Sequence, residues 1–188
     1  PTIIFHPKPY KNPPKMNIKN VEFKAKVDNL EQYENKLQSL NPKFVGLDHQ
    51  IDTYFNAHVG RLKLREGSIE NALINYDREN SLGSKESHII LYQHEPNAAL
   101  KTILTRQLGV KIIVDKKRKI YFIDNVKFHF DTVENLGTFI EVEAIENSGA
   151  FTMEELKEQC DNYRDFFELT EQNMIEKSYS DLIMELHI

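Results

Sequence analysis

The sequence predicts an α+β fold in which about eight strands form one antiparallel sheet system with a few flanking helices. Short segments in which apolar and polar residues alternate recur along the chain, and this is the period of strands with one buried face. Segments with helical spacing and capping signals separate some of them. Because 188 residues suit one domain with a substantial core, we expect a single domain at residues 20–188 after a leader at residues 1–19.

The leader is defined by its prolines, which disfavour regular structure. It contains Pro1, Pro7, Pro9, Pro13 and Pro14. We expect it to lie on the surface, although the apolar residues Ile3, Ile4 and Phe5 leave an edge strand as an alternative.

The first strand and first helix follow the leader. Val21, Phe23 and Ala25 alternate with polar residues, which predicts a strand at residues 20–27. Asp28 and Glu31 have the spacing of a capping box and predict a helix start. Further strands are expected at residues 43–56, 58–66, 71–78, 87–93, 110–116, 118–123, 126–131 and 139–145.

Two further helices are marked by their ends. Residues 96–108 begin with proline and are followed by Gly109, which predicts a helix that stops at the glycine. Thr152 and Glu155 form a second capping box, and Phe151 with Leu156 has the spacing of a hydrophobic staple. The C-terminal part is therefore expected to be helical.

The composition excludes several classes of function. A net charge of -5 argues against non-specific nucleic-acid binding, which requires a broad basic face. Cys160 is the only cysteine, so neither an intrachain disulfide nor a thiolate metal cluster is expected. The chain has no apolar run of roughly 18 to 20 residues and no signal-peptide core, and we expect a cytoplasmic protein without a membrane partner.

The sign of the charges is the most informative feature of the strands. Arg61, Lys63 and Arg65 share one parity of a single strand, whereas Glu141 and Glu143 share one parity of another. One interpretation is a half-buried sheet with a solvated outer face. The other is a closed barrel with a polar lumen, because eight strands enclose room for one small ligand, and solvated faces usually mix the two signs.

A lumen with these charges would suit a polyphosphate together with a hard divalent ion. Lysine and arginine neutralise phosphate oxygens, and carboxylates without cysteine favour Mg²⁺ or Mn²⁺. No P-loop, GxGxxG, GxSxG or HExxH motif is present, so a glycine phosphate loop and serine or zinc hydrolysis have no sequence support.

Five stretches together resemble the CYTH family, which includes class IV adenylyl cyclases and thiamine triphosphatases. Residues 20–26 (NVEFKAK) are similar to the N-terminal ExExK signature, and residues 131–143 (DTVENLGTFIEVE) are the most specific match. Between them, residues 52–55, the basic strand ending in Leu64-Arg65, and residues 114–118 follow the family's order. The resemblance implies a closed eight-stranded antiparallel β-barrel, the triphosphate tunnel, with flanking helices.

The resemblance also implies roles for individual residues. Metal would be held by Glu22, Asp131, Glu141 and Glu143. Phosphates would be held by Lys24, Lys26, Arg61, Lys63, Arg65, Arg78, Lys116 and Arg118; of these, Arg61 and Lys63 are equally consistent with charges at the tunnel mouth or surface. Catalysis would depend on Lys24, Glu22 and Arg65. His129, Tyr54 and Tyr121 are interpreted as wall or core residues.

Two positions depart from the family pattern. Asn20 stands where the signature has its first glutamate, so a second metal site loses support. The usual lysine-glycine-proline is replaced by Tyr76-Asp77-Arg78, and we hypothesise that Arg78 supplies the missing charge.

The activity expected from this resemblance is hydrolysis of a triphosphate with Mg²⁺ or Mn²⁺ as cofactor. The substrate would be inorganic triphosphate, a nucleoside triphosphate or thiamine triphosphate. The alternatives are an adenylyl cyclase that releases pyrophosphate and a non-catalytic polyphosphate or nucleotide binder. The partner would be this small molecule and not a nucleic acid, and the protein would be a monomer or a homodimer.

Overall fold

A computed structural model describes residues 18–77, 85–146 and 149–186. The proposed phosphate ligand Arg78 and residues 1–17 of the predicted leader lie outside the described residues. The first strand begins at Ile18, so the last two residues assigned to the leader belong to the sheet.

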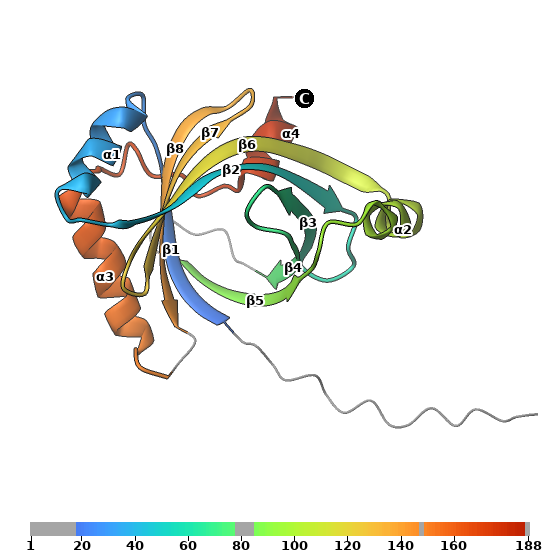
Figure 1. Ribbon diagram of the computed structural model, residues 1–188, viewed down its shortest axis with the longest axis horizontal. Coiled ribbons are helices and arrows are strands. Elements are labelled where there is room, and N and C mark those ends of the chain that lie inside the picture. The colour runs from blue at the N-terminus through green and yellow to red at the C-terminus, as the bar shows by residue number, and fades with distance from the viewer. Residues whose placement is uncertain (1–17, 78–84, 147–148, 187–188) are drawn as a thin grey trace, which may run out of the picture.

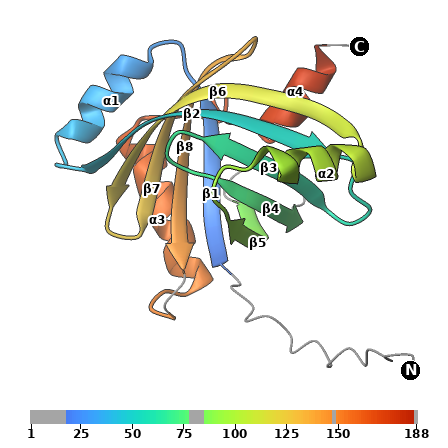
Figure 2. The ribbon, with the colours of Figure 1, turned by 45° about the vertical axis from the view of Figure 1, so that its right-hand side comes forward.

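Eight strands form one antiparallel sheet that curls round a central space (Figures 1 and 2). The strand order is β1-β5-β4-β3-β2-β6-β7-β8, and β1 pairs with β5 on one side and with β8 on the other. The predictions of an α+β fold and of eight antiparallel strands are confirmed. The bounds are β1 Ile18–Lys26, β2 Lys43–Phe55, β3 Arg61–Gly67, β4 Ala72–Asp77, β5 Lys85–Gln93, β6 Val110–Ile123, β7 Val126–Val133 and β8 Gly137–Glu146.

The main hydrophobic core lies outside the curl, between the sheet and two helices. Helices α1 (Leu30–Gln38) and α3 (Met153–Phe166) cover the outer face of the sheet (Figure 1). Phe23, Phe128 and Val142 pack there with Leu156 of α3 and Phe167, which follows it. The apolar side chains of these strands face this core. Because successive side chains of a strand point to opposite faces, the polar side chains face the interior of the curl.

Two shorter helices complete the described structure. Helix α2 (Ala98–Leu108) has no buried residue. Helix α4 (Tyr179–Glu185) starts at the capping box of Ser178 and Asp181. Its residues Tyr179 and Ile183 form a second apolar cluster with residues of β2, β6, β7 and β8. No helix in the described residues is long and apolar enough to cross a membrane.

Three sequence predictions require correction at their boundaries. The strands expected at residues 110–116 and 118–123 are one strand, β6. The first helix is capped by Asn29, whose side chain accepts from the Gln32 amide, and not by a box of Asp28 and Glu31. Helix α2 is capped by Asn97 and ends at Gly109, which has φ +69°. The capping box of Thr152 and Glu155 is confirmed.

Candidate active site

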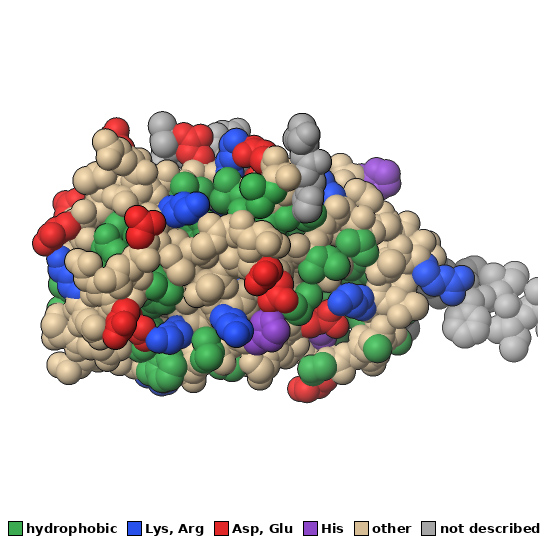
Figure 3. Space-filling view, turned by 90° about the horizontal axis from the view of Figure 1, so that it is seen from above, with side chains coloured by type: hydrophobic (Ala, Val, Ile, Leu, Met, Phe, Trp, Pro, Cys, Tyr) green, Lys and Arg blue, Asp and Glu red, His purple; other side chains and the backbone are tan. Residues whose placement is uncertain are grey.

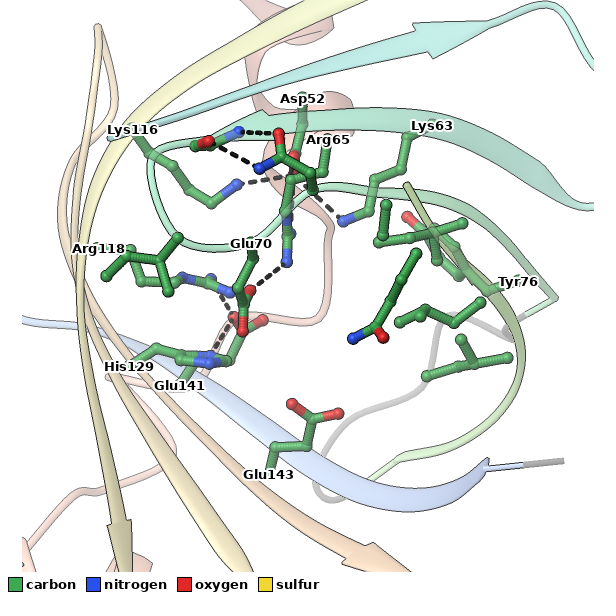
Figure 4. Close-up of a pocket in the computed structure, with 18 of the residues that line it drawn as sticks. Asp52, Lys63, Arg65, Glu70, Tyr76, Lys116, Arg118, His129, Glu141 and Glu143 are labelled. Atoms are coloured by element: carbon green, nitrogen blue, oxygen red, sulfur yellow. Dashed lines mark hydrogen bonds and ion pairs between the residues drawn. The ribbon is translucent and has the colours of Figure 1, made fainter. Parts of the chain in front are cut away.

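A cavity of about 690 Å³ lies within the curled sheet and is lined by the inward parity of its strands. The close-up shows Lys63, Arg65 and Lys116 gathered round Asp52 and Glu143 on the opposite side, with Glu70 between the two (Figure 4). In contrast, the outer surface seen in Figure 3 intersperses both signs with apolar residues. The charged lining residues are Glu22, Lys24, Asp52, Lys63, Arg65, Glu70, Glu95, Lys116, Arg118, Lys127, Glu141 and Glu143.

Asp52 gathers three cations at one side of the cavity, and we call this group the cationic pole. Arg65 donates to both carboxylate oxygens of Asp52, from Nε at 2.9 Å and from Nη2 at 3.0 Å. Lys116 Nζ and Lys63 Nζ lie 2.7 and 3.2 Å from Oδ2. Burial alone would raise the pKa of Asp52, but the three cations outweigh it and hold that pKa well below its usual range. The pole therefore carries a net positive charge.

Lys116 is the most deeply buried cation of this pole, with 2% of its surface exposed. Burial lowers the pKa of Lys116 to about 7, and the neighbouring Arg65, Arg118 and Lys63 add to the reduction, whereas Asp52 opposes it. Its ammonium group would gain most from an additional anion, because an opposite charge stabilises the protonated form.

Arg118 joins two carboxylates on adjacent strands. Its Nε and Nη2 donate to Asp131 at 2.7 and 2.6 Å, and Nη2 also donates to Glu141 at 2.5 Å. The Tyr179 hydroxyl donates to Asp131 at 2.7 Å. Lys24 Nζ lies 3.3 Å from Glu141 and 4.2 Å from the centre of the Tyr179 ring. The strand register explains this meeting, because Glu141 pairs with Lys24 on β1.

His129 faces Glu141 from β7 and is 2% exposed. Its Nδ1 lies 3.4 Å from a Glu141 oxygen, and neither ring nitrogen has a hydrogen-bond partner among the described residues. Burial, together with Arg118 and Lys127, lowers the pKa of His129 to about 3. The imidazole is therefore neutral at physiological pH.

Glu22 and Glu143 form the acidic pole at the β1–β8 side of the cavity. They are paired in the strand register, and burial together with repulsion from Glu22 raises the pKa of Glu143. Asn20 donates to Glu143 at 2.6 Å and to Glu22 at 3.4 Å. Its Oδ1 is buried and, among the described residues, accepts no hydrogen bond.

The donor set at the acidic pole fits a hard divalent ion. Its two carboxylates supply oxygen ligands, which Mg²⁺ and Mn²⁺ prefer. The described residues contain no group of three or more His, Cys, Asp or Glu side chains arranged as a metal cage. Mg²⁺ is commonly held by only one or two carboxylates together with substrate phosphates, so this open arrangement is compatible with it.

A loop between β3 and β4 contributes a carboxylate to the centre of the cavity. Glu70 accepts from Arg65 Nη1 at 3.0 Å and from Gln50 at 3.1 Å, and it is paired with Lys127. Burial would raise its pKa, but Lys127 and Arg65 outweigh burial and lower that pKa strongly. Figure 4 shows Glu70 between the groups around Asp52 and Glu141.

The loop that carries Glu70 is fixed by a buried aspartate. Asp48 accepts from the backbone N–H groups of Ile69 and Glu70 at 2.8 and 3.0 Å and from the Ser68 hydroxyl at 3.0 Å. Gly67 approaches so closely that an added Cβ would lie 2.8 Å from an Asp48 oxygen. These contacts therefore fix the backbone of the loop at Glu70.

Most of the predicted site residues meet in this cavity. Lys26 is exposed at the end of β1, and Arg61 pairs with Asp181 of α4 at 2.9 Å; neither lines the cavity. Asp131 is fully buried against Arg118 and Tyr179. The cavity is lined by the predicted residues Glu22, Lys24, Lys63, Arg65, Lys116, Arg118, Glu141 and Glu143.

Sequence reasoning missed several residues of the site. Asp48 and Asp52 lie on the same, inward-facing side of β2, and their alternating positions in the sequence could have identified them. Lys127 shares the parity of His129 and could have been found in the same way. Glu70 lies in a loop, where no periodicity marks it.

A family model for the CYTH domain matches residues 19–179. The chain belongs to the CYTH domain family. The resemblance seen in the sequence is thus confirmed, and members of this family bind triphosphate substrates as triphosphatases or adenylyl cyclase-like enzymes.

Individual CYTH relatives agree with this assignment. The chain is 26% identical over 174 residues to a candidate adenylate cyclase of Methanocaldococcus jannaschii, covering 86% of this chain and 97% of that protein. A conserved hypothetical protein of Pyrococcus furiosus superposes with a TM-score of 0.74 at 25% identity, over 87% of this chain and 99% of the other. HpAC1 from Hippeastrum, a candidate adenylyl cyclase with a dominant triphosphatase activity, shares the fold at 11% identity with a TM-score of 0.59, over 90% and 95% of the two chains.

Proposed function

We propose that this CYTH protein is a divalent-metal-dependent phosphohydrolase that uses the curled sheet as a tunnel for a triphosphate. The observation that carries the proposal is the gathering of three cations at one side of the cavity and of two carboxylates at the other. Lys63, Arg65 and Lys116 surround Asp52 on one side, and Glu22 and Glu143 lie on the other. A phosphate chain held by the cations could share a metal ion with the carboxylates.

The protein's own residues would act by binding and orientation. Arg65 and Arg118 present guanidinium groups, and a phosphate would compete with Asp52 and Asp131 for their paired N–H donors. Lys24 and Lys116 add point charges from β1 and β6. Phosphoryl transfer requires mainly positioning and electrostatic stabilisation from the protein, and this cation set is suited to that task.

The metal would be held by Glu22 and Glu143, with Glu141 nearby. When bound, Mg²⁺ or Mn²⁺ would neutralise charge on the phosphate oxygens. The raised pKa of Glu143, caused by burial and by Glu22, supports this position, because a cation would relieve that repulsion.

The same cation set would also serve an adenylyl cyclase, in which a ribose 3′-hydroxyl attacks the α-phosphorus and pyrophosphate leaves. The relative from M. jannaschii favours this second candidate. Hydrolysis by water at the terminal phosphorus demands no fixed ribose, and HpAC1 shows that the fold supports a dominant triphosphatase activity.

Product analysis tests the proposal directly. Purified protein is incubated with inorganic triphosphate, ATP or thiamine triphosphate, with Mg²⁺ or Mn²⁺ and with EDTA as a control. We expect metal-dependent release of phosphate. Cyclic AMP with pyrophosphate would instead establish the cyclase, and tight binding without any product would establish a binding protein.

A matched pair of variants tests the site. Lys63→Met removes one cation while Asp52 keeps Arg65 and Lys116 as partners, so the fold should persist and the rate should fall by about 100-fold, as for loss of one electrostatic contact to the transition state. Lys117→Met alters an exposed lysine and should leave the rate unchanged. Equal rates for both variants would contradict the site.

A further inference from the structure

Among the described side chains, those of one wall of the cavity carry no charge. The described lining side chains of β4 and β5 are uncharged, whereas the neighbouring strands contribute Lys63 and Arg65 from β3 and Glu22 and Lys24 from β1. The described side chains of this wall are Ala72, Ile74, Tyr76, Ile89, Leu91 and Gln93. We call them the β4–β5 wall.

The β4–β5 wall is one contiguous surface beside the cationic pole. Ile74 pairs with Leu91 and Tyr76 pairs with Ile89 in the register of the two strands. On its other side Ile74 pairs with Lys63 of β3, whose ammonium group lies 5.6 Å from the centre of the Tyr76 ring. Figure 4 shows Lys63 and Tyr76 together, on the side of the cavity away from Arg118 and His129.

The β5 half of the wall is partly open to the cavity, whereas Ala72 and Ile74 of β4 are buried. Ile89 and Leu91 are half-buried although they face the interior, whereas outward-facing Phe128 and Val142 are fully buried beneath helices. Leaving apolar side chains against a hydrated cavity forfeits the free energy that their burial would yield. Apolar walls with a few placed polar groups are typical of pockets for organic ligands.

We propose that the β4–β5 wall binds the organic group of a triphosphate ester. The preferred ligand is then a triphosphate that carries a flat and largely apolar group, such as a nucleobase or another heterocycle, and not inorganic triphosphate. The phosphates lie on the cationic pole and the organic group lies beyond Lys63, against Ile89 and Leu91. This inference rests on the proposed triphosphate site.

Binding measured by calorimetry tests whether the β4–β5 wall holds the organic group, independently of catalysis. Dissociation constants are measured for ATP, methyl triphosphate and inorganic triphosphate with Ca²⁺, to slow turnover. We expect ATP to bind at least tenfold more tightly than methyl triphosphate, which presents the same ester phosphate without a base. Equal affinities for the two esters, or tighter binding of inorganic triphosphate than of ATP, would overturn the inference.

Variants of adjacent residues on β5 localise the effect. Leu91→Asn places an amide on the inner face, and we expect it to weaken ATP binding about tenfold more than it weakens triphosphate binding. Ile90→Asn alters the next residue, which is 65% exposed on the outer face, and should shift neither affinity. If Leu91→Asn lowers the folded fraction, Leu91→Ala replaces it. A loss that is equal for both ligands would assign the wall a structural role only.

These binding measurements distinguish failure of the inference about the β4–β5 wall from failure of the proposed function. If no triphosphate binds at all, the triphosphate site itself is wrong and the inference falls with it. If all three bind without preference for the base, the triphosphate site stands and the β4–β5 wall is rejected.

Discussion

Lys116 offers a quantitative prediction, because triphosphate binding should be coupled to proton uptake at its side chain. In the free protein, burial and neighbouring cations lower the pKa of Lys116 to about 7. A phosphate beside it would add negative charge and raise that pKa toward the usual value of about 10.4. Binding above neutral pH must then draw a proton from the solution.

The size of the effect follows from these two pKa values. At pH 8 a group with a pKa of about 7 is about 0.1 protonated, whereas one with a pKa near 10 is almost fully protonated. Protonation of Lys116 should therefore contribute an uptake of about 0.9 proton at pH 8 and only about 0.1 at pH 6. By linkage, the affinity for triphosphate falls about tenfold per pH unit between pH 8 and 9. Phosphate groups, with a second pKa near 6, contribute little in that range.

Isothermal titration calorimetry in buffers with different ionisation enthalpies measures the uptake directly. The slope of the observed enthalpy against buffer ionisation enthalpy gives the number of protons. Lys116→Met should abolish the uptake, whereas Lys117→Met, which alters an exposed neighbour, should preserve it. An uptake below about 0.2 proton at pH 8, or one that persists in Lys116→Met, would refute the reasoning.

Three other changes have definite expected outcomes. Asp52→Asn removes the carboxylate shared by three cations, of which Arg65 and Lys116 are buried, and should lower the free energy of unfolding by about 3–5 kcal/mol, measured by urea denaturation. Added triphosphate should restore part of this free energy, and a loss below about 1 kcal/mol would contradict the role of Asp52. Glu70→Gln frees Arg65 and Lys127 from a competing negative charge, so calorimetry should show triphosphate affinity about five- to tenfold higher, and weaker binding would count against it. Phe128→Ala creates a cavity outside the site and should cost about 3–5 kcal/mol in urea denaturation, while activity per folded molecule stays the same.

The strands were predictable where one face packs against helices. In β1 the apolar parity of Val21, Phe23 and Ala25 forms part of the core beneath α1 and α3, so alternation in the sequence reports burial directly. The division of β6 into two strands was wrong because residues 115–119 form an unbroken polar run. In the structure Lys116 and Arg118 face the cavity and Lys117 faces solvent. A strand that is polar on both faces gives no hydrophobic signal.

The identity of the site residues was more predictable than their partners. Parity placed Lys24, Arg65 and Glu141 on the polar faces of their strands, the CYTH resemblance assigned them to a tunnel, and the cavity contains all three. The pairing of Asp131 with Arg118 depends on the register between β6 and β7, which one sequence does not specify. Glu70 depends on a loop conformation that Asp48 fixes from another strand, and this contact has no local sequence signal.

The charge balance of the cavity constrains how any triphosphate can bind. The described lining residues comprise six lysines and arginines and six aspartates and glutamates, so the cavity is not a simple basic tunnel. A ligand with several negative charges must therefore bring positive charge with it or take cations from their present carboxylate partners. A divalent ion at Glu22 and Glu143 would supply the first, and release of Arg65 from Glu70 would supply the second. A proton at Lys116 would add one more charge, so metal dependence and proton uptake are expected from the same balance.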